Sequence, residues 1–229
     1  PLSRIGRRLL PLGWSVVDDA NTDTKLPGYY AFDGQGIRPT RVELVNNGVV
    51  QNLLMSRVPR KNFVASTGHA RTIGSERFLA IPSIVTVKPK RHSTSRRMTR
   101  KGLQLSSQTG SDYILVVKYI EPFALTEDFE IAFSGDEQLS GLTTPTVVVR
   151  RYADGREEPI RGMRFVGVDR RILKDIVLAG PQQDFVGMTD HSSGRYGIGP
   201  TSGSLVSWSV PSILIEEVEL NSIEVKLKS

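Results

Sequence analysis

Short runs of apolar and β-branched residues, each only a few positions long, recur along most of the chain. In Val206-Ser207-Trp208-Ser209-Val210 apolar and polar residues alternate strictly, as in a strand with one buried face. Comparable runs predict further strands, at residues 14–18, 41–45, 49–55, 113–120, 129–133, 146–152, 156–160, 205–210, 213–220 and 223–227. The pattern therefore predicts a chain dominated by strands.

Two pairs of these runs are separated by turn residues. Asn46-Asn47-Gly48 lies between the runs at 41–45 and 49–55. Asn-Gly favours a type I′ turn, in which both central residues take a positive φ, so we expect a β-hairpin here. Ala153-Asp154-Gly155 separates the runs at 146–152 and 156–160 in the same way and predicts a second hairpin.

Helical periodicity is rare. The clearest stretch is 169–179, where Asp169 can cap the first turn, apolar residues recur on one side, and Gly180-Pro181 follows. A second helix is expected near 95–106, and an irregular loop at the glycine-rich stretch 187–203. We therefore expect a β-rich α+β fold in one domain spanning 1–229, with curved antiparallel sheets or a distorted barrel and a few packing helices.

Composition narrows the possible chemistry. The 229 residues include no cysteine, which excludes disulfides, cysteine-liganded zinc and thiol nucleophiles in this chain. No stretch approaches the roughly 20 apolar residues that span a bilayer. The start Pro1-Leu2-Ser3-Arg4 has neither Met nor an apolar segment, so we expect a fragment or processed product without a signal peptide, and a cytoplasmic location.

The net charge of +6 arises in one segment. Seven cations and no acidic residue fall within 88–101, namely Lys88, Lys90, Arg91, Arg96, Arg97, Arg100 and Lys101. Such runs are usually solvated, and we expect an exposed connection. The alternative function is a nucleic-acid-binding module that uses this run. It is the less favoured hypothesis because no aromatic residue lies between Phe78 and Tyr113.

No complete catalytic constellation is visible. The only histidines are His69, His92 and His191, and none has a neighbour at a metal-binding spacing. A hydrolase centred on Asp190 and His191 ranks last, because the chain has no Gly-x-Ser-x-Gly nucleophile motif. We therefore expect no catalytic residue and no metal or other cofactor in this chain.

Several motifs nevertheless occur together in a fixed order. They are the turn at 28–36, the hairpin at 41–49 with Leu53-Leu54-Met55-Ser56-Arg57, the loop Ser66-Thr67-Gly68-His69-Ala70-Arg71, the hairpin at 152–162, and the stretch 209–219. Their order and spacing resemble the TldD/PmbA family, known as modulators of DNA gyrase. The resemblance covers residues 18–219, with the helix expected at 169–179 in the place of a family helix.

The resemblance implies a β-rich C-terminal domain, preceded in the parent protein by an α+β domain, and a zinc-dependent peptidase. Active members bind zinc through a His-Glu-x-x-x-His helix and a cysteine in a late glycine-rich loop. The helix motif is absent here, and Thr189 stands near the cysteine position. A threonine hydroxyl is a poor zinc ligand, although Asp190 or His191 could replace the cysteine.

We therefore expect the C-terminal domain of a TldD/PmbA-like peptidase, or of a non-catalytic homologue, that shapes a chamber for extended or unfolded peptide. The family also implies pairing with a second such subunit, in a homodimer or a heterodimer. Arg71 could meet a substrate carboxylate or form a structural salt bridge. The candidate peptide-binding residues are Ser66, Thr67, Gly68, His69 and Arg71 in one loop, and Thr189, Asp190 and His191 in the other.

Overall fold

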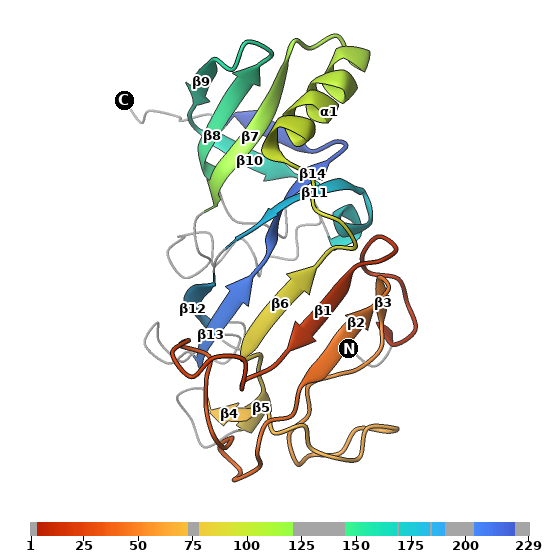
Figure 1. Ribbon diagram of the computed structural model, residues 1–229, viewed down its shortest axis with the longest axis vertical. Coiled ribbons are helices and arrows are strands. Elements are labelled where there is room, and N and C mark those ends of the chain that lie inside the picture. Colours follow the sequence, from red (N-terminus) through yellow and green to blue (C-terminus); the bar gives the residue numbers. More distant parts are fainter. Residues whose placement is uncertain are drawn as a thin grey trace, which may run out of the picture. The chain divides into compact units, whose positions relative to one another are not determined.

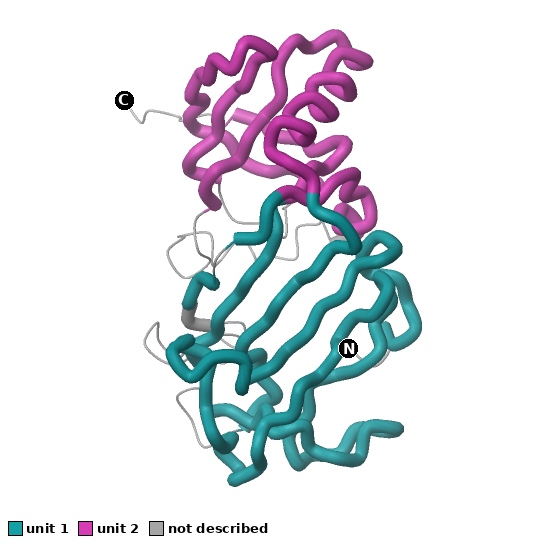
Figure 2. The backbone as a smooth tube through the Cα atoms, viewed as in Figure 1, with its two compact units in different colours: residues 1–92, 181–212 teal, residues 93–180, 213–229 magenta. Residues whose placement is uncertain are grey.

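The structure is a computed structural model that describes residues 4–72, 78–120, 145–168, 170–183, 185–190 and 204–222. The chain forms two compact units. The first consists of residues 1–92 and 181–212, and the second of residues 93–180 and 213–229 (Figure 2). Each unit therefore combines an early stretch of the chain with a later one.

A six-stranded sheet forms the centre of the first unit (Figure 1). In spatial order its strands are β12 (Val186–Asp190), β13 (Ser204–Ser209), β6 (Ile84–Lys88), β1 (Ser15–Asp18), β2 (Val42–Asn46) and β3 (Val49–Val50). Neighbouring strands are antiparallel except β13 and β6, which are parallel. A separate two-stranded sheet pairs β4 (Ala70–Thr72) with β5 (Phe78–Ala80).

The hairpin between β2 and β3 is confirmed, with Val45 opposite Val50. Asn47 has a φ of 49° and Gly48 a φ of 79°, as a type I′ turn requires. A Cβ on Gly48 would lie 2.3 Å from the carbonyl oxygen of Leu10. Glycine is therefore needed here both for its conformation and for its lack of a side chain.

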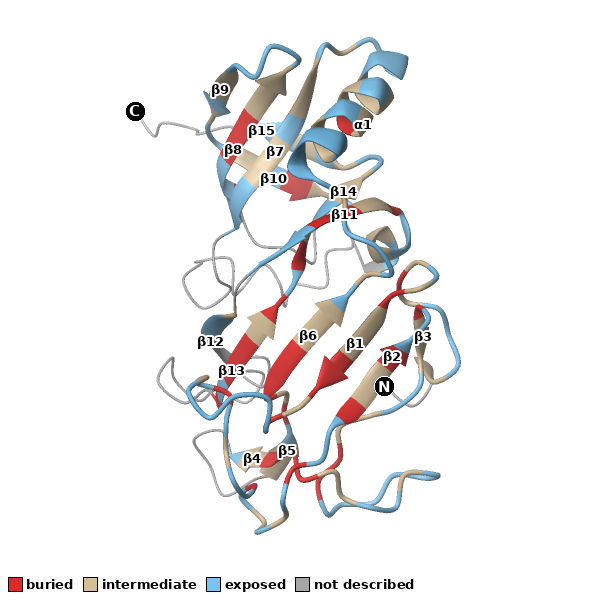
Figure 3. Ribbon diagram, in the orientation of Figure 1, coloured by how far each residue is buried: buried red, intermediate tan, exposed pale blue. Residues whose placement is uncertain are grey.

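The core of the first unit lies against the middle of its sheet (Figure 3). Ile81, Val85 and Val206 are buried together, and Trp208 packs against them. Burying such a side chain stabilises the fold by about 1.5–3 kcal/mol. The expectation of one exposed face for this strand is wrong, because Ser207 is buried as well. Its hydroxyl accepts a hydrogen bond from the Gly28 amide at 3.3 Å, which satisfies the buried oxygen.

The second unit contains a three-stranded antiparallel sheet of β7 (Tyr113–Ile120), β8 (Pro145–Tyr152) and β9 (Glu157–Ile160). The helix α1 (Ser95–Gln108) packs against β7, where a Cβ on the buried Gly102 would lie 3.0 Å from Ile114. Another pair of strands joins β10 (Met163–Val166) to β15 (Glu219–Ser222). Within the described ranges, no helix has the length and apolar character needed to cross a membrane.

The helix expected at 169–179 is wrong. A short 3₁₀ helix spans Arg170–Lys174, and β11 (Ile176–Gln182) follows it and pairs with β14 (Pro211–Ile215). The four apolar residues that start β11 fit a helix stripe and a buried strand equally well, and β-branched Ile176 and Val177 favour the strand.

Other boundaries also differ from expectation. Residues 187–190 belong to β12 instead of a loop, β3 has only two residues, and the run at 213–220 is divided between β14 and β15. The strands expected at 129–133 and 223–227 lie outside the described residues. The β-rich α+β class is confirmed, and the described sheets do not close into a barrel.

Candidate functional site

Asp18, the last residue of β1, has a fully buried carboxylate with several partners. The Ser83 amide donates to Oδ2 at 2.9 Å, and the Ser83 hydroxyl donates to Oδ1. His69 Nε2 lies 3.4 Å from the same Oδ1. A buried carboxylate without such partners would be strongly destabilising, so Ser83 and His69 explain how the fold keeps it.

His69 is also fully buried, and both ring nitrogens have neighbours. Nδ1 lies 2.9 Å from the Thr67 carbonyl oxygen and 2.9 Å from the Thr67 hydroxyl, while Nε2 is directed at Asp18. The Tyr30 ring meets the imidazole edge-on, with 6.5 Å between centroids. The imidazole is therefore enclosed by the fold and ties the 66–71 loop to the end of β1.

Tyr30 connects this buried group to Arg71. Its hydroxyl donates to the Gly68 carbonyl at 2.9 Å, and the Arg71 guanidinium lies 5.1 Å from the centre of its ring. Burial, followed by the negative charge of Asp18, raises the pKa of the Tyr30 phenol well above its ordinary value. Tyr30 is therefore a neutral donor. Arg71 Nη1 itself donates to the Pro82 carbonyl at 2.9 Å.

A turn at 33–37 supports β4 from the other side. Asp33 Oδ1 accepts from the amides of Gln35 at 2.9 Å and Ile37 at 2.8 Å, and Oδ2 accepts from the Ala70 amide at 3.0 Å. The Gly34 amide returns a bond to the Ala70 carbonyl at 2.7 Å. This turn, which overlaps the motif at 28–36, therefore fixes the backbone immediately before Arg71.

The first group of candidate residues lies together in one ordered loop. Ser66 and Thr67 are half-buried, Gly68 and His69 are buried, and Arg71 in β4 is half-buried. In the second group, Thr189 and Asp190 lie in β12, opposite Leu205 and Ser204 of β13. His191 lies outside the described residues.

One hydrogen bond joins residues that lie next to the two groups. The hydroxyl of Ser204 donates to the carbonyl of Thr72 at 3.2 Å. Thr72 follows Arg71 at the end of β4, and Ser204 begins β13 opposite Asp190 of β12, so this contact joins the end of β4 to the start of β13. The two predicted segments are therefore linked within the first unit through Thr72 and Ser204, which lies between them.

Two residues of this site were not singled out from the sequence. Asp18 and Ser83 are separated by 65 positions, and neither belongs to a recognisable local motif. The sequence feature that could have identified Asp18 is its position within a predicted strand, directly after the apolar pair Val16-Val17. This feature indicates a polar residue at the end of a strand, but it does not indicate which residues contact it.

The donor groups present do not fit a zinc site. Among the described residues, no three side chains of His, Cys, Asp or Glu cluster as metal ligands would. Asp18 and His69 are two side chains of these types, and they are directed at each other inside the fold. The expectation that this chain holds no zinc of its own stays a prediction.

Two solved structures have a fold similar to that of this chain. The chain is similar to a protein described as a "putative modulator of a DNA gyrase" from Thermotoga maritima, with 17% identity and a TM-score of 0.56, over 95% of this chain and 41% of that one. It is similar to TldE from Thermococcus kodakarensis, with 13% identity and a TM-score of 0.55, over 97% of this chain and 43% of that one. These likenesses show the fold, and the chain spans about two fifths of each relative.

No curated protein matches the sequence. The family model described as the PmbA/TldA metallopeptidase C-terminal domain matches residues 1–222, nearly the whole chain. The resemblance read from the ordered motifs is thereby confirmed, and the chain belongs to the C-terminal domain family of the PmbA/TldA metallopeptidases.

Proposed function

We propose that this chain forms one wall of a peptide-binding chamber and takes extended peptide along the outer edge of β12. β12 is the outermost strand of the six-stranded sheet, and its backbone pairs on one side with β13. No described residue hydrogen-bonds to its other side. An open strand edge binds extended chains through backbone N–H and C=O groups, largely independently of sequence.

The opposite edge of the same sheet is covered. Val50 of β3 donates to the Arg7 carbonyl at 3.0 Å and accepts from the Gly6 amide at 2.9 Å. Arg8 forms an isolated bridge with Val49. Of the two outer strands, β12 is therefore the one that the described residues leave open for a further strand.

The observation that carries the proposal is the hydrogen bond from Ser204 to Thr72. It joins the end of β4 to the start of β13, the strand that pairs with β12, which supports a peptide path along β12 toward Arg71. The buried contacts of Asp18, His69 and Tyr30 hold that loop before any ligand arrives. A preformed site lowers the entropic cost of binding.

In this proposal the chain contributes binding and not catalysis. It has no His-Glu-x-x-x-His motif and no cysteine, and Thr189 stands near the family's cysteine position. Any peptidase chemistry belongs to other parts of the parent protein. We further propose that a second TldD/PmbA-like subunit completes the chamber, because exposed strand edges are commonly covered by association.

Photo-crosslinking tests the proposal directly. Extended peptides that carry one benzophenone at successive positions are incubated with the 229-residue chain, and the attachment sites are mapped by mass spectrometry. We expect attachment at 186–190 and 66–72. A peptide with N-methylated amides at alternate positions is the matched control, because it cannot donate to a strand edge. Attachment elsewhere, or equal binding of the N-methylated peptide, contradicts the proposal.

A further inference from the structure

We propose that Arg38 and Arg71, each stacked on an aromatic ring, form a carboxylate-binding surface that makes this site prefer acidic peptides. This inference rests on the proposed function and names its substrate class. The inference is argued from two arginines, the aromatic rings on which they stack, and the backbone contacts between the segments that bear the arginines.

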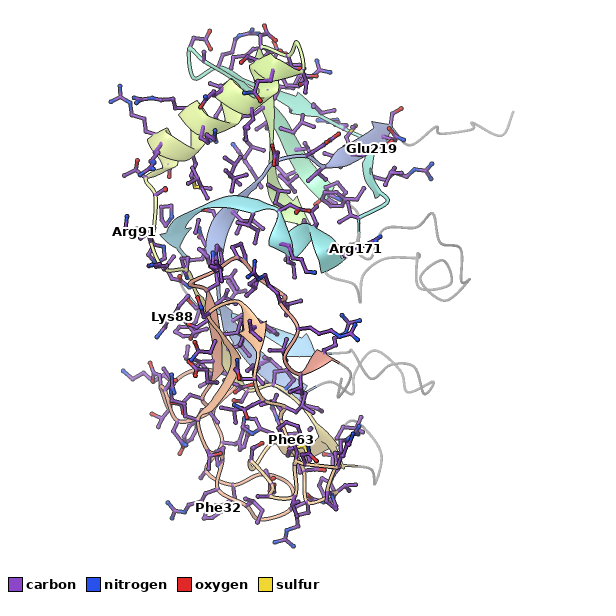
Figure 4. The ribbon with its side chains drawn as sticks, turned by 90° about the vertical axis from the view of Figure 1, so that its right-hand side faces the viewer. Phe32, Phe63, Lys88, Arg91, Arg171 and Glu219 are labelled. Atoms are coloured by element: carbon purple, nitrogen blue, oxygen red, sulfur yellow. The ribbon has the colours of Figure 1, made fainter. Side chains whose placement is uncertain are left out.

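Both guanidinium groups lie over rings from one short segment. Arg38 Cζ lies 5.0 Å from the centre of the Phe32 ring, and Arg71 Cζ lies 5.1 Å from the centre of the Tyr30 ring. Phe32 is 52% exposed and lies at the outer surface of its unit (Figure 4). A ring beneath a guanidinium restricts its orientation, so less entropy is lost when its N–H fork meets a carboxylate.

The segments that bear the two arginines are in backbone contact. A Cβ on Gly68 would lie 2.4 Å from the Arg38 carbonyl oxygen, so no side chain fits between them. The Thr40 amide donates to the Thr67 carbonyl at 3.0 Å. Arg38 and Arg71 therefore project from neighbouring, mutually supported segments of the first unit.

The charge of this region is unbalanced. Residues 28–72 hold six cations and two anions. The anions have other partners, because Asp33 accepts from three backbone amides and Glu43 accepts from the Asn46 side chain at 2.9 Å. Within the described ranges, no ion pair joins a carboxylate to Arg38, Arg57, Arg60 or Lys61. These four exposed cations are therefore complementary to an acidic ligand.

An acidic peptide fits this surface better than a nucleic acid. Single-stranded nucleic acids bind by stacking bases on exposed aromatic rings. Here Phe32 and Tyr30 each have a guanidinium over the ring, and the Tyr30 hydroxyl is bonded to Gly68. In addition, Arg71 is next to Thr72, which is bonded to Ser204 at the start of β13, the strand that pairs with β12. A peptide on that strand edge would have its side chains within this region.

The test measures binding of the 229-residue chain to fluorescent peptides of equal length, rich in Glu, in Gln or in Lys, by anisotropy. We expect the Glu peptide to bind about fivefold more tightly than the Gln peptide at low salt, since an exposed charge pair contributes about 1.4- to fivefold. The advantage should shrink as salt rises. Arg38→Ala should remove most of the preference for the Glu peptide. Phe32→Leu should reduce this preference, because the Arg38 guanidinium loses the ring that restricts its orientation.

The matched control is Arg97→Ala, which removes one charge from an exposed position on α1 in the second unit. It should leave the ratio of Glu to Gln affinities unchanged. Because Arg38 and Arg97 are both exposed, both variants should fold, which circular dichroism verifies.

Three other outcomes of these measurements would overturn the inference. Equal affinity for Glu and Gln peptides, or equal effects of the two arginine variants, overturns the acidic preference while β12 crosslinking stands. No binding of any peptide overturns the proposed function and this inference with it. Tighter binding of a single-stranded oligonucleotide that depends on Arg38 overturns the inference in favour of a nucleic-acid surface.

Discussion

Asp18 Oδ1 and His69 Nε2 lie 3.4 Å apart in the interior of the first unit, and both side chains are fully buried. The two residues are 51 positions apart. Their contact joins the end of β1 to the 66–71 loop, and Ser83 joins the start of β6 to the same carboxylate. This group therefore fixes the loop that we assign to the peptide site.

Asp18→Ala should destabilise the fold strongly. It leaves the Ser83 amide and His69 without their buried acceptor, and breaking such a pair costs about 3–5 kcal/mol. Urea denaturation measures the loss. The control is Asp19→Asn, which should matter little because the bond that Asp19 Oδ1 accepts from the Asn21 amide is exposed. Similar losses for the two variants would refute the assigned role of Asp18.

The stability of the chain should fall at high pH because of Tyr30. Its pKa is raised in the folded state by burial and by Asp18, whereas the unfolded phenol has the ordinary value of 10.0. The contribution of the neutral phenol is therefore complete below pH 10 and is lost as pH rises above it, by at most about 1.4 kcal/mol per pH unit.

Urea midpoints at pH 9, 10 and 11 test this dependence in the wild type and in Tyr30→Phe. The variant lacks the hydroxyl that titrates, so its stability should decline less steeply than that of the wild type. Since other groups titrate in both proteins, the difference in slope reports Tyr30. Identical slopes would show that Tyr30 ionises as readily in the folded chain as in the unfolded one.

Gly68→Ala should destabilise more than Gly36→Ala. Both glycines have a positive φ, 72° and 76°, so alanine costs about 1–2 kcal/mol at either position. Only at Gly68 would the added Cβ meet backbone, 2.4 Å from the Arg38 carbonyl oxygen, whereas nothing lies within 4 Å at Gly36. Thermal unfolding of both variants measures the difference. Equal losses would show that the two segments can separate without cost.

The purified chain should contain no stoichiometric zinc. It has no cysteine, and His69 is engaged inside the fold. Elemental analysis of protein prepared without chelator measures the metal content. One tightly held zinc per chain would contradict this prediction and direct attention to Asp190 and His191.

Much of the architecture could be predicted because its signals are local. Asn47-Gly48 determines the first hairpin through two positive φ values, and the run at 113–120 matches β7. β11 could not be distinguished from a helix by its sequence, because the apolar run that begins at Ile176 is compatible with a buried strand and with a helix. The pairing of β11 with β14, which the sequence does not reveal, makes it a strand.

The candidate site could likewise be predicted from its local motif but not from contacts between distant segments. The motif at 66–71 identified the loop, but the loop histidine gave no sign that His69 would be enclosed. Its burial depends on Asp18 and Tyr30, which are distant in sequence. Likewise, the alternation around Ser207 predicted an exposed hydroxyl, whereas Gly28 approaches from a remote segment and covers it. Contacts between distant segments decide which polar residues are accessible.

Hydrogen–deuterium exchange of the β12 amides tests the central claim most directly. The amides of residues 186–190 that are not bonded to β13 should exchange rapidly in the isolated chain and slowly when an excess of extended peptide is present. The outer amides of β3, which the 6–8 segment already covers, serve as the internal reference. Slower exchange confined to β12 and the adjoining 66–72 segment is the predicted result. Peptide binding that leaves the exchange of β12 unchanged would contradict the account.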